Sequence, residues 1–423
     1  MKIVVVGSGG REHAIIKKLL ENPKVETVYA LPGNGGIAAD AQCVPIGVKD
    51  IPAIAQFAKT HAIDFAVVAS DDPLGLGAVD ALNAAGIPCF GPDQKAAQIE
   101  CSKVFSKNLM KKYNIPTAAY EVFDNAADAL AYIRRVGAPI VVKADGLALG
   151  KGATVAMTVE EAETAVRAAM VDRVFGDSGS RIVVEEFMTG PEVSVLAFCD
   201  GETLVPMVSS MDHKRAHDGD TGPNTGGMGT IAPNPYYTPE IAAQCMKTIF
   251  LPTVRAMQQE GRPFRGCLYF GLMLTPNGPK VIEYNCRFGD PETQVVLPLL
   301  KSDLLTVMQA CANGTLAQTP VEFSDKAACC VILASDGYPA KYASGFPISI
   351  PKGLNAQVYI AGAKLEGETL CTAGGRVLGV SCTGETLREA VDRAYAAAAQ
   401  VHFENAYYRR DIGRRALECK GGF

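Results

Sequence analysis

The chain has 423 residues, of which 48% are hydrophobic and 20% charged, and its formal net charge at pH 7 is −5. This length exceeds what one hydrophobic core supports and predicts a globular protein of roughly two to four domains. The small acidic excess, without a basic block, argues against a nucleic acid or an anionic membrane as a partner, and no apolar run approaches the ~18 residues of a membrane span.

The N-terminus and the cysteines indicate a cytoplasmic protein. Only four apolar residues separate Lys2 from Gly7, which is too short for the apolar core of a signal peptide. No two of the 13 cysteines have Cys-x-x-Cys spacing, and the adjacent pair Cys329 and Cys330 lies in an apolar run. We therefore expect reduced thiols that pack as small hydrophobic residues, rather than disulfides or a metal centre.

Strand and helix patterns alternate through the first hundred residues. The expected strands cover about 2–6, 25–30, 65–69 and 87–90, and the expected helices begin near residue 11 and cover about 51–60 and 76–85. This alternation predicts an α/β domain with a doubly wound parallel sheet. A boundary is expected near Asn114–Pro116, which gives an N-terminal domain of residues 1–116.

A glycine-rich turn, Gly7–Glu12, joins the first expected strand to the first helix. The amides and the dipole at a helix start favour an anion. A dinucleotide fingerprint would require glycine at position 12 and an acid at the end of the second strand, where residues 29–33 read Tyr-Ala-Leu-Pro-Gly. The turn therefore favours one phosphate monoester, held by the glycine amides and Arg11, and a plain strand–helix turn is the structural alternative.

Residues 117–192 form a smaller unit around the glycine-rich loop 145–152, which expected strands at 139–144 and 153–156 flank. A strand on both sides excludes the strand–loop–helix of a Walker A motif. We expect a mobile flap that closes over nucleotide phosphates, with a structural hairpin as the alternative. A capping box at Thr158 and Glu161 begins the next helix, and a strand at 181–185 follows.

Residues 193–328 contain a long polar loop at 209–230 that is rich in functional side chains. Long loops in compact domains are usually functional. A metal role for His213 and His217 is possible, but neither has a ligand partner at a useful spacing elsewhere in the chain.

A strand at 280–285 places Glu283 and Asn285 on one face, with Arg287 two positions beyond. Carboxylate and amide oxygens suit Mg²⁺, and arginine stabilises the charge of a phosphoryl group in transfer. An edge strand with a solvated polar face is the alternative, but it leaves the following Gly-Asp-Pro-Glu unexplained.

The pattern of strands and one helix in the last ~95 residues predicts a small α+β domain at 329–423. A strand at 328–334 and a Gly/Pro-rich connector at 337–353 precede several short strands. A helix then places Leu387, Val391, Ala394, Tyr395 and Ala398 on one side.

Four motifs, in order, resemble the glycinamide ribonucleotide synthetases, or phosphoribosylamine–glycine ligases, of the ATP-grasp superfamily. They are residues 4–14, 141–152, 212–229 and 281–294, and the likeness extends to 374–377 and 408–413. The resemblance implies an α/β fold in which the N-terminal doubly wound domain precedes a central ATP-grasp fold. Its two α+β subdomains, about 117–192 and 193–328, hold the nucleotide between them.

The resemblance implies that ATP drives the joining of glycine to 5-phospho-β-D-ribosylamine through glycyl phosphate, in purine biosynthesis, with Mg²⁺ or Mn²⁺. We expect a monomer whose partners are these small molecules. Another ATP-grasp carboxylate–amine ligase is the nearest alternative. An NAD-dependent oxidoreductase is disfavoured by Glu12. An inactive ATP-binding regulator would have no reason to keep Glu283, Asn285, Arg287 and Asp290 together.

The resemblance also implies roles for individual residues. The implied ATP-binding residues are Lys103, Lys143, Gly146, Gly150, Lys151, Gly152, Glu185, Glu186, Phe187, Met188 and Glu192. The implied substrate-binding residues are Gly9, Gly10, Arg11, Glu12, Asp71, Asp212, Arg287 and Asp290, the catalytic ones are Arg287, Asp290 and Lys214, and the metal ligands are Glu283 and Asn285.

Two departures from the family pattern matter. Asp71 stands where the family has a longer acid, so a contact there must be made differently. The strand before the metal strand is apolar at 269–272, so phosphates or water must complete the metal's coordination.

Overall fold

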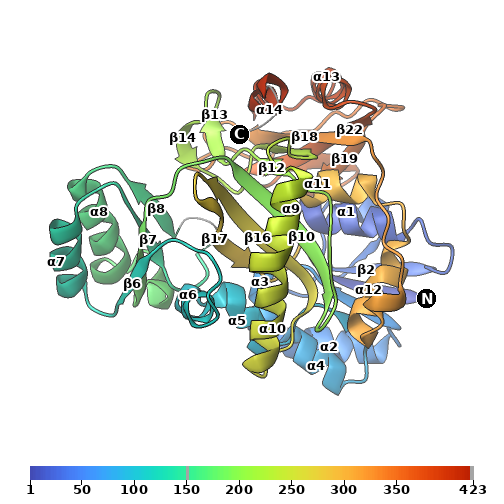
Figure 1. The fold of residues 1–423 in the computed structure, drawn as a ribbon. Helices are drawn as coiled ribbons and strands as arrows, with labels where there is room; N and C mark the ends of the chain where they lie inside the picture. Colours follow the sequence, from blue (N-terminus) through green and yellow to red (C-terminus); the bar gives the residue numbers. More distant parts are fainter. Residues whose placement is uncertain (149–151, 420–423) are drawn as a thin grey trace.

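The computed structural model describes residues 1–148 and 152–419. The N-terminal sheet is five-stranded and parallel, in the order β3-β2-β1-β4-β5 (Figure 1). Apart from Lys2, every residue of β1 is buried, as expected for a parallel strand covered on both faces. The predicted doubly wound sheet is confirmed. Its elements are β1 Lys2–Gly7, α1 Gly10–Leu19, β2 Thr27–Pro32, β3 Gln42–Cys43, α2 Ile51–Thr60, β4 Phe65–Val68, α3 Asp71–Gly75, α4 Ala78–Ala84 and β5 Cys89–Phe90.

Two helices, α5 Gln94–Cys101 and α6 Lys103–Lys112, lead to a small four-stranded antiparallel sheet in the order β6-β9-β7-β8. Its apolar residues form a cluster of their own beneath two helices, and in Figure 1 this unit stands apart on the left. Its elements are β6 Tyr120–Phe123, α7 Ala126–Val136, β7 Ile140–Ala144, β8 Ala153–Ala156, α8 Val159–Val166 and β9 Ile182–Glu186.

The predicted start of α8 is confirmed with one change. The Thr158 hydroxyl accepts the Glu161 N–H at 3.2 Å, as a capping residue does. The Glu161 carboxylate accepts the N–H of Met157 at 2.7 Å, one residue before the cap. The helix start is therefore held from both directions.

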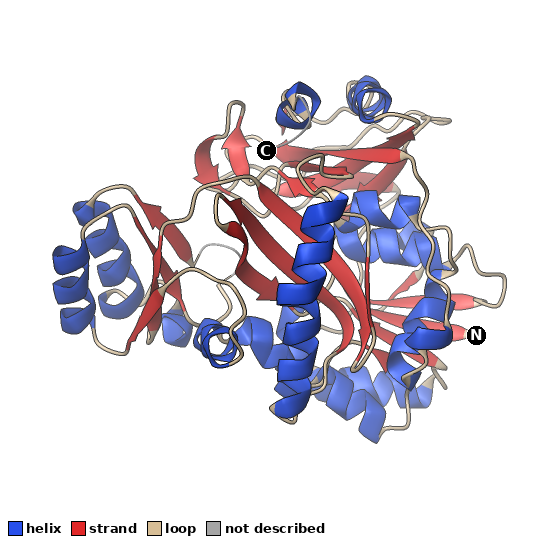
Figure 2. Cartoon of the chain, viewed as in Figure 1, coloured by secondary structure: helices blue, strands red, loops and turns tan. Residues whose placement is uncertain are grey.

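The large sheet is antiparallel, in the order β11-β10-β16-β17. Helices α9 and α10, joined through residues 246–250, lie along it as one long rod (Figure 2). A register shift at Gly271 and Leu272 interrupts the pairing of β16 with β17. The elements are β10 Glu192–Asp200, β11 Leu204–Pro206, α9 Pro239–Cys245, α10 Leu251–Gln259, β16 Arg265–Thr275, β17 Gly278–Asn285, α11 Thr293–Val296 and α12 Leu304–Asn313.

The C-terminal sheet has the order β12-β15-β18-β22-β19, with β23 beside β18. Strand β12 lies within residues 209–230, and β15 begins there and ends two residues beyond. The prediction of a loop at 209–230 is therefore wrong for β12, for β15 and for the β13–β14 hairpin between them. The elements are β12 Met211–Asp212, β13 Arg215–His217, β14 Thr221–Asn224, β15 Gly229–Ala232, β18 Ala327–Ser335, β19 Gln357–Ile360, β20 Ala363–Glu366, β21 Thr369–Thr372, β22 Arg376–Gly384, α13 Leu387–Ala398, β23 Ala406–Tyr407 and α14 Arg414–Glu418.

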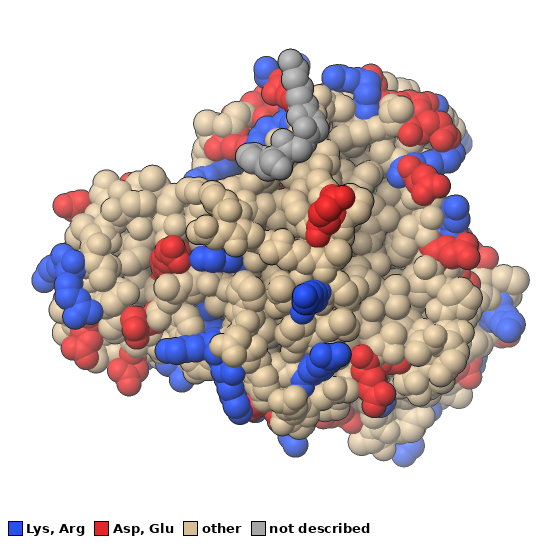
Figure 3. Space-filling model, viewed as in Figure 1, with Lys and Arg blue, Asp and Glu red and all other residues tan. Residues whose placement is uncertain are grey.

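The surface and the thiols fit an ordinary globular protein. On the face in Figure 3, acidic and basic side chains are interspersed. All 13 cysteines are free, and only Cys43, Cys101 and Cys419 are not buried. Within the described part of the chain, no helix combines the length and hydrophobicity that a bilayer span requires.

Candidate active site

A cavity of about 700 Å³ lies where the four sheets approach one another. The N-terminal part of the chain contributes Arg11, Asp71, Glu100 and Lys103 to its lining. The small and large sheets contribute β7, β9 and β17, and the C-terminal region contributes Tyr338, Arg376 and Arg415. Every part of the fold therefore reaches one shared space.

On the small-sheet side, two lysines bind the same carboxylate oxygen. The Nζ atoms of Lys143 and Lys107 lie 3.0 Å and 3.1 Å from Glu185 Oε2. Burial lowers the pKa of Lys107 to about 8, against the opposing effect of Glu185. The other oxygen, Glu185 Oε1, is buried without a hydrogen-bond partner in the structure. An unpaired buried acceptor is costly, so this oxygen is available to an N–H donor in the cavity.

On the large-sheet side, β17 places Glu283 and Asn285 in the cavity lining. Lys214 Nζ lies 3.9 Å from Glu283 Oε1 and 3.6 Å from Glu192 Oε2. Burial raises the pKa of Glu283, but Lys214, Lys143 and Lys103 outweigh it and the pKa is lowered. Glu283 is therefore ionised at neutral pH.

The donor set at Glu283 and Asn285 fits a magnesium ion. The Asn285 amide nitrogen donates to the Tyr284 carbonyl at 2.8 Å, which leaves the amide oxygen free for a ligand. A carboxylate and an amide oxygen are the hard donors that Mg²⁺ prefers, and phosphates and water usually complete its shell. Among the described residues, no cluster of three or more His, Cys, Asp or Glu side chains offers an alternative.

On the N-terminal side, arginines and acids pair around the cavity. Arg287 Nη2 lies 3.0 Å from Glu100 Oε1, and Arg11 Nε lies 2.7 Å from Glu12 Oε1. Asp71 Oδ1 is 4.0 Å from Arg11 Nη2. Carboxylates of the protein therefore already neutralise part of the positive charge of Arg287 and Arg11.

The glycine turn is closed by the chain's own carboxylates. The Gly9 N–H donates to Glu12 Oε2 at 2.6 Å, and the Arg11 N–H donates to Asp290 Oδ2 at 3.3 Å. Gly9 has φ −96°, so glycine is needed there for close approach: a Cβ would lie 2.8 Å from Glu12 Oε2. Of the glycine amides predicted to form the cradle, that of Gly9 is therefore taken by Glu12 in this structure.

Most of the predicted residues do line the cavity. Those that do are Arg11, Asp71, Lys103, Lys143, Gly152, Glu185, Glu186, Phe187, Met188, Glu192, Asp212, Lys214, Glu283, Asn285, Arg287 and Asp290. Gly9, Gly10, Glu12 and Gly146 are not part of the lining. Gly150 and Lys151, together with Leu149 of the predicted flap, lie outside the described residues.

The sequence did not single out several residues of the lining. Glu292 is buried and accepts from the hydroxyls of Tyr269 at 2.9 Å and Ser194 at 3.2 Å. Arg376 Nη1 donates to the Asp290 carbonyl at 2.8 Å and lies 3.5 Å from its carboxylate. Glu292 lies in the motif at 281–294 and Arg376 in the one at 374–377, and the resemblance rests on both. Membership of these motifs is the signal by which the sequence could have identified the two residues.

Asp212 faces this group of residues from β12. Burial and the charge of Glu292 raise its pKa well above the usual value, although Lys214 and Arg376 oppose them. The protonated form of this carboxyl group is therefore favoured more than it is in an exposed aspartate.

The two histidines of the 209–230 region have structural partners. The ring of His213 lies between the Gly229 carbonyl at 3.1 Å and the Gly413 N–H at 3.1 Å. His217 Nδ1 lies 3.1 Å from the Tyr407 hydroxyl. Both ring nitrogens of His213 therefore have protein partners, as does Nδ1 of His217.

Comparisons with known proteins agree along the chain. Family models of phosphoribosylglycinamide synthetase match as the N domain at residues 1–100, the ATP-grasp (A) domain at 101–293 and the C domain at 328–415. Phosphoribosylamine–glycine ligases of Vibrio cholerae and Rhizobium meliloti are each 49% identical, over 423 and 419 residues, with 99% of both chains covered.

Solved structures give the same result. The phosphoribosylamine–glycine ligase of Thermotoga maritima superposes with a TM-score of 0.86 at 34% identity, covering 97% of this chain and 100% of that one. A biotin carboxylase of Campylobacter jejuni superposes with a TM-score of 0.75 at 14% identity, covering 99% and 95%. The second match shows the fold alone.

Proposed function

The chain belongs to the phosphoribosylglycinamide synthetase family, and from that premise we propose how its cavity performs the reaction. It is an ATP-dependent ligase of purine biosynthesis that joins glycine to phosphoribosylamine. The observation that carries the assignment of roles is the meeting of Glu283, Asn285 and Lys214 with Arg287 in one cavity.

The chemistry requires an activated carboxylate, because an oxide ion is a very poor leaving group. A carboxylate oxygen of glycine attacks the γ-phosphorus of ATP, and the bond to ADP breaks to give glycyl phosphate. The ribosylamine nitrogen then attacks the carbonyl carbon, phosphate leaves, and the nitrogen loses a proton. The protein contributes positioning and charge stabilisation to both steps.

The nucleotide lies between the small and large sheets in this proposal. Glu185 Oε1, which lacks a partner in the cavity wall, accepts from the adenine amino group. The backbone of Glu186–Met188 borders the ring, Glu192 binds ribose hydroxyls, and Lys103 and Lys143 bind phosphates. Water must be kept from the acyl phosphate, because this intermediate hydrolyses.

Glu283 and Asn285 hold Mg²⁺, which when bound neutralises charge on the phosphates; Mn²⁺ is the alternative ion. Lys214, whose pKa Glu192, Tyr269 and Glu283 raise despite burial, stays cationic and faces the transferring phosphoryl group. Arg287 orients the glycine carboxylate, and Asp290 lies near the amine.

Phosphoribosylamine lies on the N-terminal side, near Asp71 and Asp212. Arg11 is the group that we assign to its 5-phosphate. Use of the Gly9 and Gly10 amides would require Glu12 to leave its hydrogen bond to Gly9.

The proposed enzyme is a monomer in the cytoplasm. The free, mostly buried thiols support a reducing, cytoplasmic location.

One assay tests the proposed function. Purified protein with ATP and Mg²⁺ should release ADP only when glycine and freshly made phosphoribosylamine are both present. Each component is omitted in turn, and alanine or aspartate replaces glycine in parallel reactions. Equal ADP release with alanine or aspartate would contradict the assignment of glycine as the acid.

A further inference from the structure

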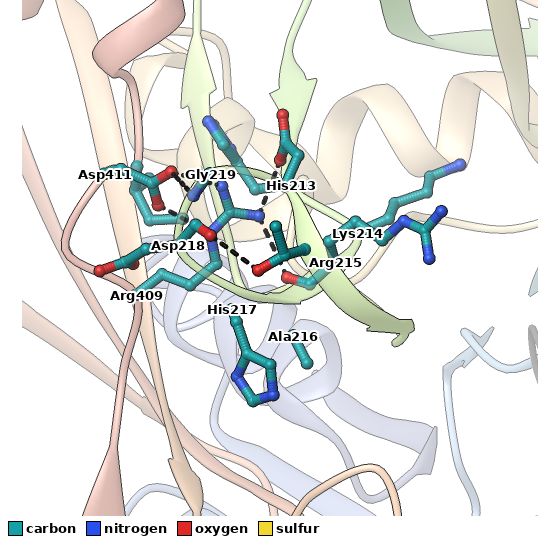
Figure 4. A network of polar contacts seen from close by, with 12 residues as sticks. His213, Lys214, Arg215, Ala216, His217, Asp218, Gly219, Arg409 and Asp411 are labelled. Carbon is teal, nitrogen blue, oxygen red and sulfur yellow. Dashed lines mark hydrogen bonds and ion pairs between the residues drawn. The ribbon is translucent and has the colours of Figure 1, made fainter.

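The β13–β14 hairpin is attached to a C-terminal segment, residues 407–415, residue by residue (Figure 4). The contacts run from one end of β13 to the following turn. They are His213 Nε2 to Gly413 N at 3.1 Å, the Arg215 carbonyl to Arg409 at 3.1 Å, the Ala216 carbonyl to the Tyr407 hydroxyl at 2.9 Å, Asp218 Oδ1 to Arg410 N at 2.7 Å and Gly219 N to Asp411 Oδ2 at 2.8 Å.

Arg409 is the centre of this attachment. Its side chain is 1% exposed, and its Nε and Nη2 donate to the two oxygens of Asp411 at 2.8 Å and 2.9 Å. Its Nη1 donates to the Arg215 carbonyl and lies 2.9 Å from Asp220 Oδ1. A guanidinium fork paired at every nitrogen fixes its partners in direction as well as distance.

The hairpin has little apolar packing of its own. In β13 and β14 only Ala216 is buried, and a lone two-stranded hairpin is marginally stable in water. Its position therefore depends on polar contacts, and those with the C-terminal segment hold β13 and the turn that follows it.

Lys214 is the exception among residues 213–220. Its neighbours His213 and Arg215 are held by the C-terminal segment, whereas its side chain points away from Arg409 (Figure 4). Its Nζ lies beside Glu192 and Glu283 in the cavity. Anchoring the residues on both sides sets where the Lys214 amine can reach.

We propose that Arg409 is a positioning residue for the reaction, which holds the hairpin so that Lys214 stays beside Glu283. The inference rests on the role of Lys214 in the proposed function. It gives Arg409, which is not part of the cavity lining, a task in catalysis. A displacement of about 1 Å in a positioned group can cost up to ~100-fold in rate.

A double-mutant cycle in the full-length protein tests this. The variants are Arg409→Met, Lys214→Met and the double variant, with Arg414→Met as the control, since Arg414 is exposed and pairs with Glu418 within α14. Steady-state ADP release gives kcat and the KM of each substrate. We expect Lys214→Met and Arg409→Met each to lower kcat, the latter about 10- to 100-fold, while Arg414→Met leaves kcat unchanged.

The interaction between the two changes is decisive. If Arg409 acts through Lys214, Arg409→Met should lower kcat by less than about twofold further in the Lys214→Met protein. Full multiplication of the two losses would overturn the inference and leave the proposed function standing. A Lys214→Met enzyme with wild-type kcat would overturn both the role of Lys214 and the inference.

A second variant covers failure of Arg409→Met to fold, as judged by circular dichroism. Asp411→Asn keeps the shape of the partner but removes its charge, and it is combined with Lys214→Met in the same cycle. Loss of kcat that disappears in the Lys214→Met background supports the inference, and loss that persists there overturns it.

Discussion

The carboxylate of Glu12 accepts the N–H of Gly9 at 2.6 Å and so closes the turn that begins α1. Glu12 is 1% exposed, and its other oxygen holds the Arg11 guanidinium. With Asp290 on the Arg11 amide, two carboxylates occupy positions that an anion would otherwise take. A phosphate in the cavity therefore meets the side chain of Arg11 before it meets the glycine amides.

Glu283→Gln tests the metal site, because it keeps the shape of the side chain and removes its charge. We expect kcat to fall by at least 100-fold, since a group that stabilises phosphoryl charge is worth about 3–4 kcal/mol. Steady-state ADP release at saturating Mg²⁺ is the measurement, and the exposed Glu368→Gln serves as the control. A loss below tenfold would mean that β17 does not hold the metal.

Asn285→Ala tests the second proposed ligand. Removing one neutral oxygen weakens Mg²⁺ binding but leaves the Glu283 charge, so the Mg²⁺ concentration that gives half-maximal rate should rise about tenfold. A Mg²⁺ titration of ADP release measures it. An unchanged half-maximal concentration would remove Asn285 from the site.

Lys103→Met tests the assignment of ATP. Lys103 Nζ has only a 3.5 Å contact with the Gly146 carbonyl, so it is free to reach phosphates. A hydrogen bond to a charged group is worth about 1.5–3 kcal/mol, and the KM for ATP should rise roughly 10- to 100-fold with the KM for phosphoribosylamine unchanged. Lys111→Met, on the exposed side of the same helix, should alter neither constant.

Local patterns predicted the strands and helices well because their causes are local. The buried run of β1 and the alternation in β17 each lie within a few residues, as does the start of α8. The same holds for Glu283 and Asn285, which share a face because side chains two apart on a strand do. These parts of the site were predictable.

Contacts between distant segments were not predictable from one sequence. β15 pairs with β18, and Arg376 reaches Asp290 from β22, and neither pairing leaves a periodic signal in the chain. The hydrogen bond of Glu12 to Gly9 is different, because an acid three residues after a helix cap is a known capping pattern. The sequence therefore contains a signal for this hydrogen bond, although the glycine-rich turn favours an interpretation as an anion site.

His213 predicts a pH dependence of stability. Burial, followed by the charge of Arg409, lowers its pKa from 6.5 to about 4. Between these values the unfolded chain binds more protons than the folded one, so stability falls as the pH falls through 6.5 towards 4. At pH 5 the loss from this group is about 2 kcal/mol.

The measurement is the midpoint of thermal unfolding at pH 7 and at pH 5. His213→Gln keeps a donor for the Gly229 carbonyl and an acceptor for the Gly413 N–H, and it does not titrate. The drop in midpoint should therefore be smaller in the variant than in the wild-type protein. Equal drops would show that His213 does not control this dependence.

Arg11→Ala tests which substrate the N-terminal side binds. The Arg11 side chain lines the cavity, and loss of one charged hydrogen bond, worth about 1.5–3 kcal/mol, should raise the KM for phosphoribosylamine roughly 10- to 100-fold. The KM for ATP should barely change, and Arg255→Ala, on the exposed side of α10, should change neither. Gly9→Val should be more damaging, because its side chain would collide with Glu12. If Arg11→Ala instead weakens ATP and spares phosphoribosylamine, the two ends of the cavity have been assigned the wrong way round.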